Sequence, residues 1–478
     1  SDGPHGIRKQ AGAGDHLGLN ASLNATCFPT AATIANSWNQ DLGEEIGQAL
    51  GEEAASMDVN ILLGPGLNIK RSPLCGRNFE YFSEDPYLSG KMAASYIRGI
   101  QSKGVYACPK HLAVNSQELR RMAMDAVVDE RTLREIYLTG FEIAVKEGHA
   151  KAIMSSYNQI NGIYANEDKH LLTDILRKEW GFNGFVYSDL SSIEGITGAR
   201  VAQNHKEASV LALKAGVDMD LGGNAYGKNL RQALKEKLIG MQDIDRAVAN
   251  ILRLKFRMGL FENPYVSPEK AGRTVRSRAH KELARQVARK GVVLLKNEGI
   301  LPLSKQLKSI AVIGPSADNM YNQLGDYTAP QERKEITTVL DGIRNTVSAS
   351  TQVTYVKGCA IRDTTAHHIP TAVEAAQKAD AVVLVVGGSS ARDFKTKYIE
   401  TGAATVTQEE NQQLSDMECG EGYDRSTLKL LGYQEKLMEA ITSTGKPVIV
   451  IYIQGRPLNM NLAAEKAQAL LTAWYPGE

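Results

Sequence analysis

Short apolar segments alternate with helix-period segments through roughly the first half of the chain, and this alternation limits the possible folds more than any other feature. The strand-like segments are brief and apolar, and they include 59–63, 105–108, 152–155 and 184–188. Amphipathic stretches typical of helices lie between them, at 88–103, 129–147 and 170–180. Strands that alternate with helices predict βαβ units around a parallel sheet. The length of this region suits a (β/α)8-like TIM barrel, which takes about 250 residues.

A second alternating region follows a proline-containing segment at 261–268 and a basic amphipathic stretch at 277–291. Its β-branched runs end in glycine, at 310–314, 381–388 and 447–455. Strands of a parallel sheet end in this way where they turn into loops at the carboxyl edge. We therefore predict a barrel over 1–263, a linker over 264–287 and an α/β sandwich domain over 288–478. The last residues form no terminating element, so we expect further structure downstream.

Composition excludes several classes of protein. The net charge of +1 gives no case for a nucleic-acid or anionic membrane partner. No apolar run reaches the roughly 18 residues that a membrane helix needs. The five cysteines are scattered without a Cys-x-x-Cys pair, so a zinc cage or disulfide framework is not expected. The chain opens at Ser1 without an initiator Met, so a missing signal peptide is uninformative about export.

Polar residues follow several of the predicted strands. Asp189 comes directly after 184–188, and alone it would more often cap the next helix than act in a reaction. Other strand ends and loops carry comparable groups: Arg77, Lys110, His111 and Tyr157. In a parallel barrel, catalytic groups lie at the carboxyl ends of strands. Together these side chains could bind the hydroxyls of one sugar.

Lys110 also permits a different chemistry, because a lysine at a barrel strand end can form a Schiff base, as in class I aldolases. That use requires a desolvated lysine with a lowered pKa, and only the adjacent His111 supports it. The histidines have no metal-binding spacing, and the glycine-rich segments lack the spacing of phosphate loops. We therefore expect neither a metal nor another cofactor.

Glycoside hydrolysis needs a second carboxylate, about 5–5.5 Å from the first in a retaining enzyme. The loop at 417–425 supplies Glu421, which could act as the general acid if the loop reaches the barrel. Burial against an aromatic ring or another carboxylate would raise its pKa. An ordinary acidic surface loop is the alternative.

Six motifs in order carry a resemblance to a known family. They are DGPHGIR at 2–8, GPGLNIKR at 64–71, GRNFEYFSEDP at 76–86, KHLAVN at 110–115, DERTLREIY at 129–137 and EWGFNGFVYSD at 179–189. Over essentially its whole length the chain resembles glycoside hydrolase family 3, the β-glucosidase family. The resemblance implies a (β/α)8-like barrel followed by an α/β sandwich domain, with the active site at their junction.

The resemblance also implies roles for individual residues. Asp189 would be the nucleophile and Glu421 the acid/base, with Glu418 as the alternative. The residues that hold the non-reducing sugar would be Asp2, Arg77, Lys110, His111 and Tyr157. Arg8 would support Asp2, whose carboxylate could accept from the 4- and 6-hydroxyls.

Three departures from the family pattern bear on specificity and length. Leu190 stands where many members carry a tryptophan after the nucleophile, so the aglycone side is expected to differ. Segment 112–118 lacks the histidine that marks the N-acetylglucosaminide branch, which disfavours a hexosaminidase or phosphorylase. Members often continue into the rest of the second domain and a fibronectin-like domain, so we expect further structure of this kind downstream.

We therefore expect a retaining, exo-acting β-glycosidase that releases terminal β-D-glucose from glycosides or small oligosaccharides. A β-xylosidase or exo-β-glucanase on the same scaffold is the alternative among enzymes, and a sugar-binding protein that has lost catalysis is the alternative from another class. A homodimer is compatible with the sequence. The resemblance favours a periplasmic or secreted location.

Overall fold

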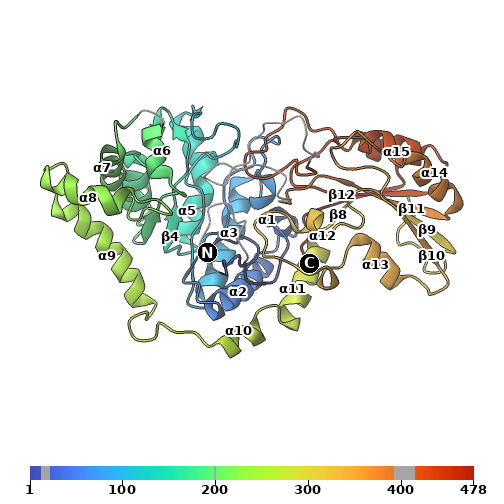
Figure 1. The fold of residues 1–478 in the computed structure, drawn as a ribbon, viewed down its shortest axis with the longest axis horizontal. Coiled ribbons are helices and arrows are strands. Elements are labelled where there is room, and N and C mark those ends of the chain that lie inside the picture. Colours follow the sequence, from blue (N-terminus) through green and yellow to red (C-terminus); the bar gives the residue numbers. More distant parts are fainter. Residues whose placement is uncertain (12–21, 199–200, 392–414) are drawn as a thin grey trace.

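The computed structural model describes residues 1–11, 22–198, 201–391 and 415–478 (Figure 1). Its N-terminal part contains α1 (Ala31–Ala35), α2 (Gln40–Ser56), β1 (Ile61–Leu62), η1 (Asn78–Glu80), α3 (Pro86–Gln101), β2 (Tyr106–Ala107), β3 (Asp125–Ala126), α4 (Glu130–Thr132), η2 (Leu133–Leu138), α5 (Thr139–Lys146), β4 (Ala152–Met154), β5 (Gln159–Ile160), β6 (Ile163–Tyr164), η3 (His170–Glu179), β7 (Phe185–Tyr187), α6 (Ser192–Gly198), α7 (His205–Ala215), α8 (Ala225–Lys235) and α9 (Met241–Arg257).

The strands of the N-terminal part pair in parallel. β1 pairs with β2, and β4 pairs with β7. Single parallel bridges extend this order from Leu112 to Ser155 and from Tyr187 to Met219. The strands are only two or three residues long, and the described residues form no continuous eight-stranded barrel. One physical reason is that Pro65 and Pro109 closely follow β1 and β2 and cannot donate to a ladder.

Helices α2 and α3 pack closely against each other, and glycines make the approach possible. A Cβ at Gly47 would lie 2.3 Å from the carbonyl oxygen of Tyr96, and one at Gly99 would lie 2.2 Å from that of Glu44. Buried side chains from α2, α3, α5 and η3 form one continuous apolar core with the strands. This core holds the strand ends, and hence the polar residues after them, in fixed positions.

The connection to the C-terminal part runs through α10 (Pro268–Thr274) and α11 (Arg278–Gly291). After α9 the chain passes below the N-terminal part and returns along α11 towards the C-terminal part (Figure 1). Both α10 and α11 contact α2. The predicted linker is therefore partly helical.

The C-terminal part is built on one six-stranded sheet. Its elements are β8 (Val293–Asn297), β9 (Ser309–Ile313), α12 (Met320–Leu324), η4 (Arg333–Glu335), α13 (Val339–Thr346), β10 (Gln352–Val356), α14 (Ile369–Lys378), β11 (Ala381–Gly387), α15 (Gln434–Thr442), β12 (Val448–Ile453), α16 (Asn461–Lys466) and β13 (Ala469–Trp474). The strand order is β10-β9-β11-β12-β13-β8, and only β8 is antiparallel.

Alternate residues of β11 face different cores. Val382, Leu384 and Val386 pack with residues of α14 and α15. Val383 and Val385 belong to a separate cluster that includes Phe79 from the N-terminal part. Strand β11 is buried along its whole length, as expected for a central strand covered on both faces. The sheet's second face therefore packs against α13 and also contacts Phe79 of the N-terminal part, and the α/β class expected from the sequence is observed.

Candidate active site

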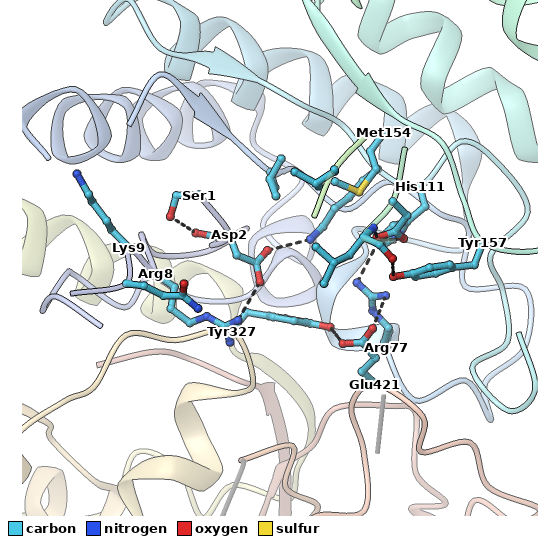
Figure 2. A pocket seen from close by; sticks show the side chains of 16 residues that line it. Ser1, Asp2, Arg8, Lys9, Arg77, His111, Met154, Tyr157, Tyr327 and Glu421 are labelled. Carbon is cyan, nitrogen blue, oxygen red and sulfur yellow. Dashed lines mark hydrogen bonds and ion pairs between the residues drawn. The ribbon is translucent and has the colours of Figure 1, made fainter. Parts of the chain in front are cut away.

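A cavity of about 330 Å³ lies where the two parts of the chain meet. All eight site residues expected from the sequence line it: Asp2, Arg8, Arg77, Lys110, His111, Tyr157, Asp189 and Glu421. Figure 2 labels six of them, and their side chains converge from segments that are far apart in the sequence: Asp2, Arg8, Arg77, His111, Tyr157 and Glu421. Apolar side chains also line the cavity, including Leu190 and Leu221. The structure thus brings the expected residues together in one place.

Asp189 lies at the end of β7 and is 8% exposed. Its Oδ1 accepts a hydrogen bond of 2.7 Å from the amide of Leu190, rather than from the first turn of α6. Its Oδ2 has no hydrogen-bond partner within the described part of the chain and lies 3.7 Å from Nε2 of His111. The structure therefore gives no support to a helix-capping role for this side chain. One carboxylate oxygen remains available to a ligand.

Burial raises the pKa of Asp189 from its ordinary value of 3.8 to about 6. The negative charge of Glu421 acts in the same direction, while Arg121, Arg77 and the Leu190 amide oppose it. The group is thus largely ionised at neutral pH but poorly solvated, which is a favourable state for a nucleophile.

Glu421 reaches the cavity from the C-terminal part and is 7% exposed. Its Oε2 accepts a hydrogen bond of 2.9 Å from the Tyr327 hydroxyl (Figure 2). Its Oε1 pairs with Nη2 of Arg121 and lies 3.9 Å from Nη1 of Arg77. Three side chains therefore fix the direction of this carboxylate.

Glu418, the alternative to Glu421, does not line the cavity. Its Oε2 lies 2.9 Å from Nη1 of Arg425 and 3.5 Å from Nε of Arg456. Arg456 is fully buried, and its Nη2 also donates to the carbonyls of Glu418 and Tyr423. Glu418 therefore helps to shape the loop from within the C-terminal part.

An ion-pair network lines part of the cavity. Lys110 Nζ lies 3.2 Å from Oδ1 of Asp2 and 3.2 Å from Oε1 of Glu80, and Arg8 Nη2 lies 3.3 Å from Oδ2 of Asp2. Burial acts to raise the pKa of Asp2, but the charges of Lys110 and Arg8 outweigh it and lower that pKa. Asp2 is therefore an ionised acceptor.

The same network keeps Lys110 charged. Burial acts to lower the pKa of Lys110, but Asp2 and Glu80 outweigh burial and raise it. A Schiff-base lysine must reach its neutral form near neutral pH. The electrostatics at Lys110 thus oppose the aldolase alternative.

His111 is buried and held on both sides of its ring. Nδ1 lies 3.3 Å from Oδ1 of Asn68, and Nε2 lies 3.3 Å from Nη2 of Arg77. Because arginine can only donate, Nε2 accepts in this arrangement and the ring proton lies on Nδ1. Burial, together with the charges of Arg77 and Lys110, lowers the pKa of His111. The imidazole is therefore neutral.

Tyr157 acts on the segment that follows Asp189. Its hydroxyl donates a hydrogen bond of 2.7 Å to the carbonyl of Leu190. The guanidinium of Arg121 lies 4.4 Å from the centre of its ring. Tyr157 therefore links the turn after β7 to the arginine that holds Glu421.

Sequence reasoning missed three residues of this arrangement: Glu118, Arg121 and Tyr327. Arg121 Nη1 lies 2.9 Å from Oε2 of Glu118, so one guanidinium joins Glu118 to Glu421. Burial raises the pKa of Glu118 from 4.5 to about 7. Tyr327 lines the cavity, with Lys110 Nζ 5.3 Å from its ring centre. A charged Glu-x-x-Arg pair shortly after Lys110 was the available signal for the first two, whereas no pattern pointed to Tyr327.

The described residues contain no group of three or more His, Cys, Asp or Glu side chains placed to hold a metal ion. Within the same residues, no helix has the length and apolarity to cross a membrane.

Comparison with known proteins gives two family matches. The model of the glycosyl hydrolase family 3 N terminal domain matches residues 5–254, and that of the C-terminal domain matches residues 292–478. A thermostable β-glucosidase B from Acetivibrio thermocellus is 38% identical over all of this chain, which spans 58% of that relative. A β-xylosidase from Formosa agariphila is 37% identical over 95% of the chain, with 62% of its own length covered.

A solved structure of a β-glucosidase from Bifidobacterium adolescentis has the same fold. It superposes with a TM-score of 0.79 and 32% identity, covering 100% of this chain and 62% of the other. The chain therefore spans about three fifths of the relatives that it matches.

Proposed function

Because the chain belongs to glycosyl hydrolase family 3, we propose that it is a retaining, exo-acting β-glycosidase that releases terminal β-D-glucose. The observation that carries the proposal is the cavity in which Asp189 and Glu421 approach from the two parts of the chain. One carboxylate has an available oxygen, and the other is oriented by Tyr327 and Arg121. Two such carboxylates are the requirement of glycosidase chemistry.

In the first step, Asp189 Oδ2 attacks the anomeric carbon. The bond from that carbon to the leaving oxygen breaks, and Glu421 gives its proton to this oxygen. In the second step, Glu421 removes a proton from water, and the water oxygen displaces Asp189 from the anomeric carbon. Two displacements retain the configuration of the sugar, and both carboxyl groups return to their starting states.

Binding of one terminal sugar is supported by the charged and polar groups that line the cavity. Ionised Asp2 can accept from the 4- and 6-hydroxyls, while Lys110 and Arg77 can donate to neighbouring oxygens. Neutral His111, fixed by Asn68, supplies a further polar contact. A cavity of about 330 Å³ lined by these groups suits a single terminal sugar and supports release of single sugars from a chain end.

The closest competing substrate is a β-xyloside, since a β-xylosidase is among the relatives. Asp2 favours a sugar that carries the hydroxymethyl group, and xylose lacks it. We expect a higher kcat/KM for an aryl β-glucoside than for the matching β-xyloside. The reverse preference would assign the chain to xylosidase activity.

The role of Asp189 is tested by Asp189→Asn. This change should lower turnover of an aryl β-glucoside by several orders of magnitude, because no nucleophile remains. The matched control is Asp220→Asn, since Asp220 follows the neighbouring parallel segment but accepts from the Ala225 amide and does not line the cavity. It should keep activity. Normal turnover by Asp189→Asn would refute the proposal, and sugar binding without any hydrolysis by the unmodified chain would favour a binding protein.

We also propose that the catalytic unit divides into domains at 1–263 and 288–478, joined by the linker at 264–287. The ranges of the two family matches and the separate sheet of the C-terminal part support this division.

A further inference from the structure

The loop that carries Glu421 contacts the N-terminal part through its backbone. Backbone hydrogen bonds join Gly420 N to Gly76 O at 2.7 Å and Arg425 N to Leu74 O at 3.2 Å. The segment at Gly76 leads directly to Arg77, which lines the cavity. The placement of Glu421 therefore depends on contacts between two parts of the chain.

Asp424 makes the most extensive side-chain contact of this kind. Its Oδ1 accepts a hydrogen bond of 2.9 Å from the Gly76 amide. Its Oδ2 accepts two hydrogen bonds of 2.8 Å, from the amides of Glu118 and Leu119. One carboxylate thus binds three backbone N–H groups on two separate segments of the other part. Hydrogen bonds to an ionised acceptor are the stronger class.

These two segments are the ones that orient Glu421. Gly76 precedes Arg77, and Glu118 pairs with Arg121, whose other amino group holds Glu421. Asp424 follows Glu421 by three residues on the same loop. It therefore ties the loop to both of the segments whose arginines contact the Glu421 carboxylate.

Other contacts also link this loop to the N-terminal part. Arg456 donates to the carbonyl of Leu74, the Cys419 thiol donates to that of Gly76, and the Gly422 amide donates to Oε2 of Glu118. Each of these contacts reaches one of the two segments, whereas the Asp424 carboxylate binds amides on both. The backbone contacts at Gly420 and Arg425 do not involve the Asp424 side chain. A change at Asp424 should therefore leave the two parts in contact while loosening the position of Glu421.

We propose that Asp424 is a positioning residue, which fixes the direction of the Glu421 carboxyl group by binding the Gly76 and Glu118–Leu119 amides. The proposal rests on the proposed function, in which Glu421 is the acid/base. Asp424 touches neither substrate nor the reacting atoms in this account. Its effect on the rate passes through Glu421 alone.

The variant Asp424→Asn isolates this effect. The amide keeps the size of the carboxyl group, but its NH₂ group faces at least one of the three N–H donors and cannot accept from it. The matched control is Asp380→Asn. Asp380 Oδ2 accepts from the amides of Lys308 and Ser309 in the C-terminal part, away from the cavity. Both variants replace a charged acceptor of backbone amides with a neutral side chain of the same size, and only the first lies on the Glu421 loop.

Substrates with leaving groups of different acidity distinguish a misplaced Glu421 carboxyl group from a general loss of folding or substrate binding. Phenyl β-glucoside needs protonation by Glu421 to lose its phenolate, whereas 2,4-dinitrophenyl β-glucoside does not. General acid catalysis contributes about 10²–10⁴-fold, so misplacement in Asp424→Asn should lower kcat/KM for the phenyl glucoside by about 10–100-fold. The value for the dinitrophenyl glucoside should change by less than about threefold, within the spread expected of a distant substitution. Asp380→Asn should resemble the unmodified chain with both substrates.

The variant Glu421→Ala completes the experiment as a double-mutant cycle on the whole chain. Glu421→Ala should show the same leaving-group pattern more strongly. Azide, which needs no base, should attack its glycosyl-enzyme at the anomeric carbon, break the bond to Asp189 and yield β-glucosyl azide. Adding Asp424→Asn to Glu421→Ala should cause no further loss, because the group through which Asp424 acts is already absent.

The outcomes distinguish the positioning role of Asp424 from the acid/base role of Glu421. Equal losses on both glucosides in Asp424→Asn, or a further loss in the double variant, would overturn the positioning role while leaving the role of Glu421 intact. If Glu421→Ala itself showed no leaving-group dependence and no glucosyl azide, the proposed acid/base assignment would fail.

Discussion

At the scale of single residues, burial gives Asp189 its reactivity and sets a lower pH limit for it. Burial raises its pKa to about 6, partly opposed by Arg121 and Arg77. The protonated form cannot attack the sugar. We predict that kcat/KM for an aryl β-glucoside falls below a pH of about 6, approaching tenfold for each further pH unit. A pH profile of initial rates checks this, and full activity at pH 4.5 would contradict it.

The same pKa shift predicts a cost in stability. The native state holds its proton on Asp189 up to a higher pH than the unfolded chain does, so the free energy of unfolding falls as the pH rises from about 4 to about 6. Asp189→Asn does not lose stability in this way, because the amide does not ionise. The free energy of unfolding of Asp189→Asn, measured relative to that of the unmodified chain, should therefore rise across this interval by at most about 3 kcal/mol and then stay constant. If the stability of Asp189→Asn relative to the unmodified chain fell with rising pH, the raised pKa of Asp189 would be contradicted.

Residues were predictable from the sequence where position along a strand revealed them. Asp189, Lys110 and Tyr157 follow apolar runs, and carboxyl ends of parallel strands converge. Tyr327 and Arg121 could not be found in this way. Tyr327 matters because a loop of the C-terminal part folds over the cavity, and Arg121 because it lies between two carboxylates distant in sequence. Such relations exist only in three dimensions.

At the scale of elements, the loop with Glu421 fits because Gly76 has no side chain. A Cβ there would lie 2.2 Å from the carbonyl oxygen of Gly420 and 2.7 Å from that of Tyr423. Gly76→Ala should therefore push the loop away and lower both the melting temperature and kcat, since overpacking costs about 1–3 kcal/mol. Thermal melts and steady-state rates check this.

Gly272→Ala is the matched control for this prediction. Gly272 lies in α10, where an added Cβ meets no atom within 4 Å. Alanine in a helix should be neutral or stabilising by up to about 1 kcal/mol. Equal behaviour of the two variants would show that the close approach at Gly76 has no consequence.

Most elements were predictable by type, because apolar runs and helical periodicity are local signals. The run at 381–388 became β11 (Ala381–Gly387), and the stretch at 88–103 became α3 (Pro86–Gln101). The strands of the N-terminal part were predicted too long. The length of each strand depends on its hydrogen bonds to the neighbouring strands and on nearby prolines, which interrupt them. Hydrophobic periodicity alone predicts neither effect.

At the scale of the whole molecule, a buried carboxylate joins the linker to the N-terminal part. Glu53 of α2 is fully buried and lies 2.9 Å from Nδ1 of His280 in α11, while the Arg276 amide donates to the same oxygen at 2.9 Å. Burial acts to lower the pKa of His280, but its bonds to Glu53 and Glu52 outweigh burial and raise it. The charged imidazole therefore stabilises the fold.

This contact predicts a pH-dependent contribution to stability. A raised histidine pKa contributes fully below the unfolded value of about 6.5 and is lost as pH rises through the folded value. His280→Gln should therefore lower the melting temperature most below pH 6, and by less above the folded pKa. Melts of both proteins across pH 5–9 measure the difference. A difference in melting temperature that stays constant or grows with rising pH would contradict a raised pKa of His280.

The central claim for the molecule is that Asp189 forms a covalent bond to the sugar. A 2-deoxy-2-fluoro-β-glucoside with a dinitrophenolate leaving group tests it, because fluorine slows both steps through its effect on the oxocarbenium-like transition state while the leaving group favours the first. We predict that peptide mass spectrometry of the inactivated chain finds one fluoroglucosyl group, attached to Asp189. A label on another carboxylate, or no label on a chain that hydrolyses β-glucosides, would contradict the account.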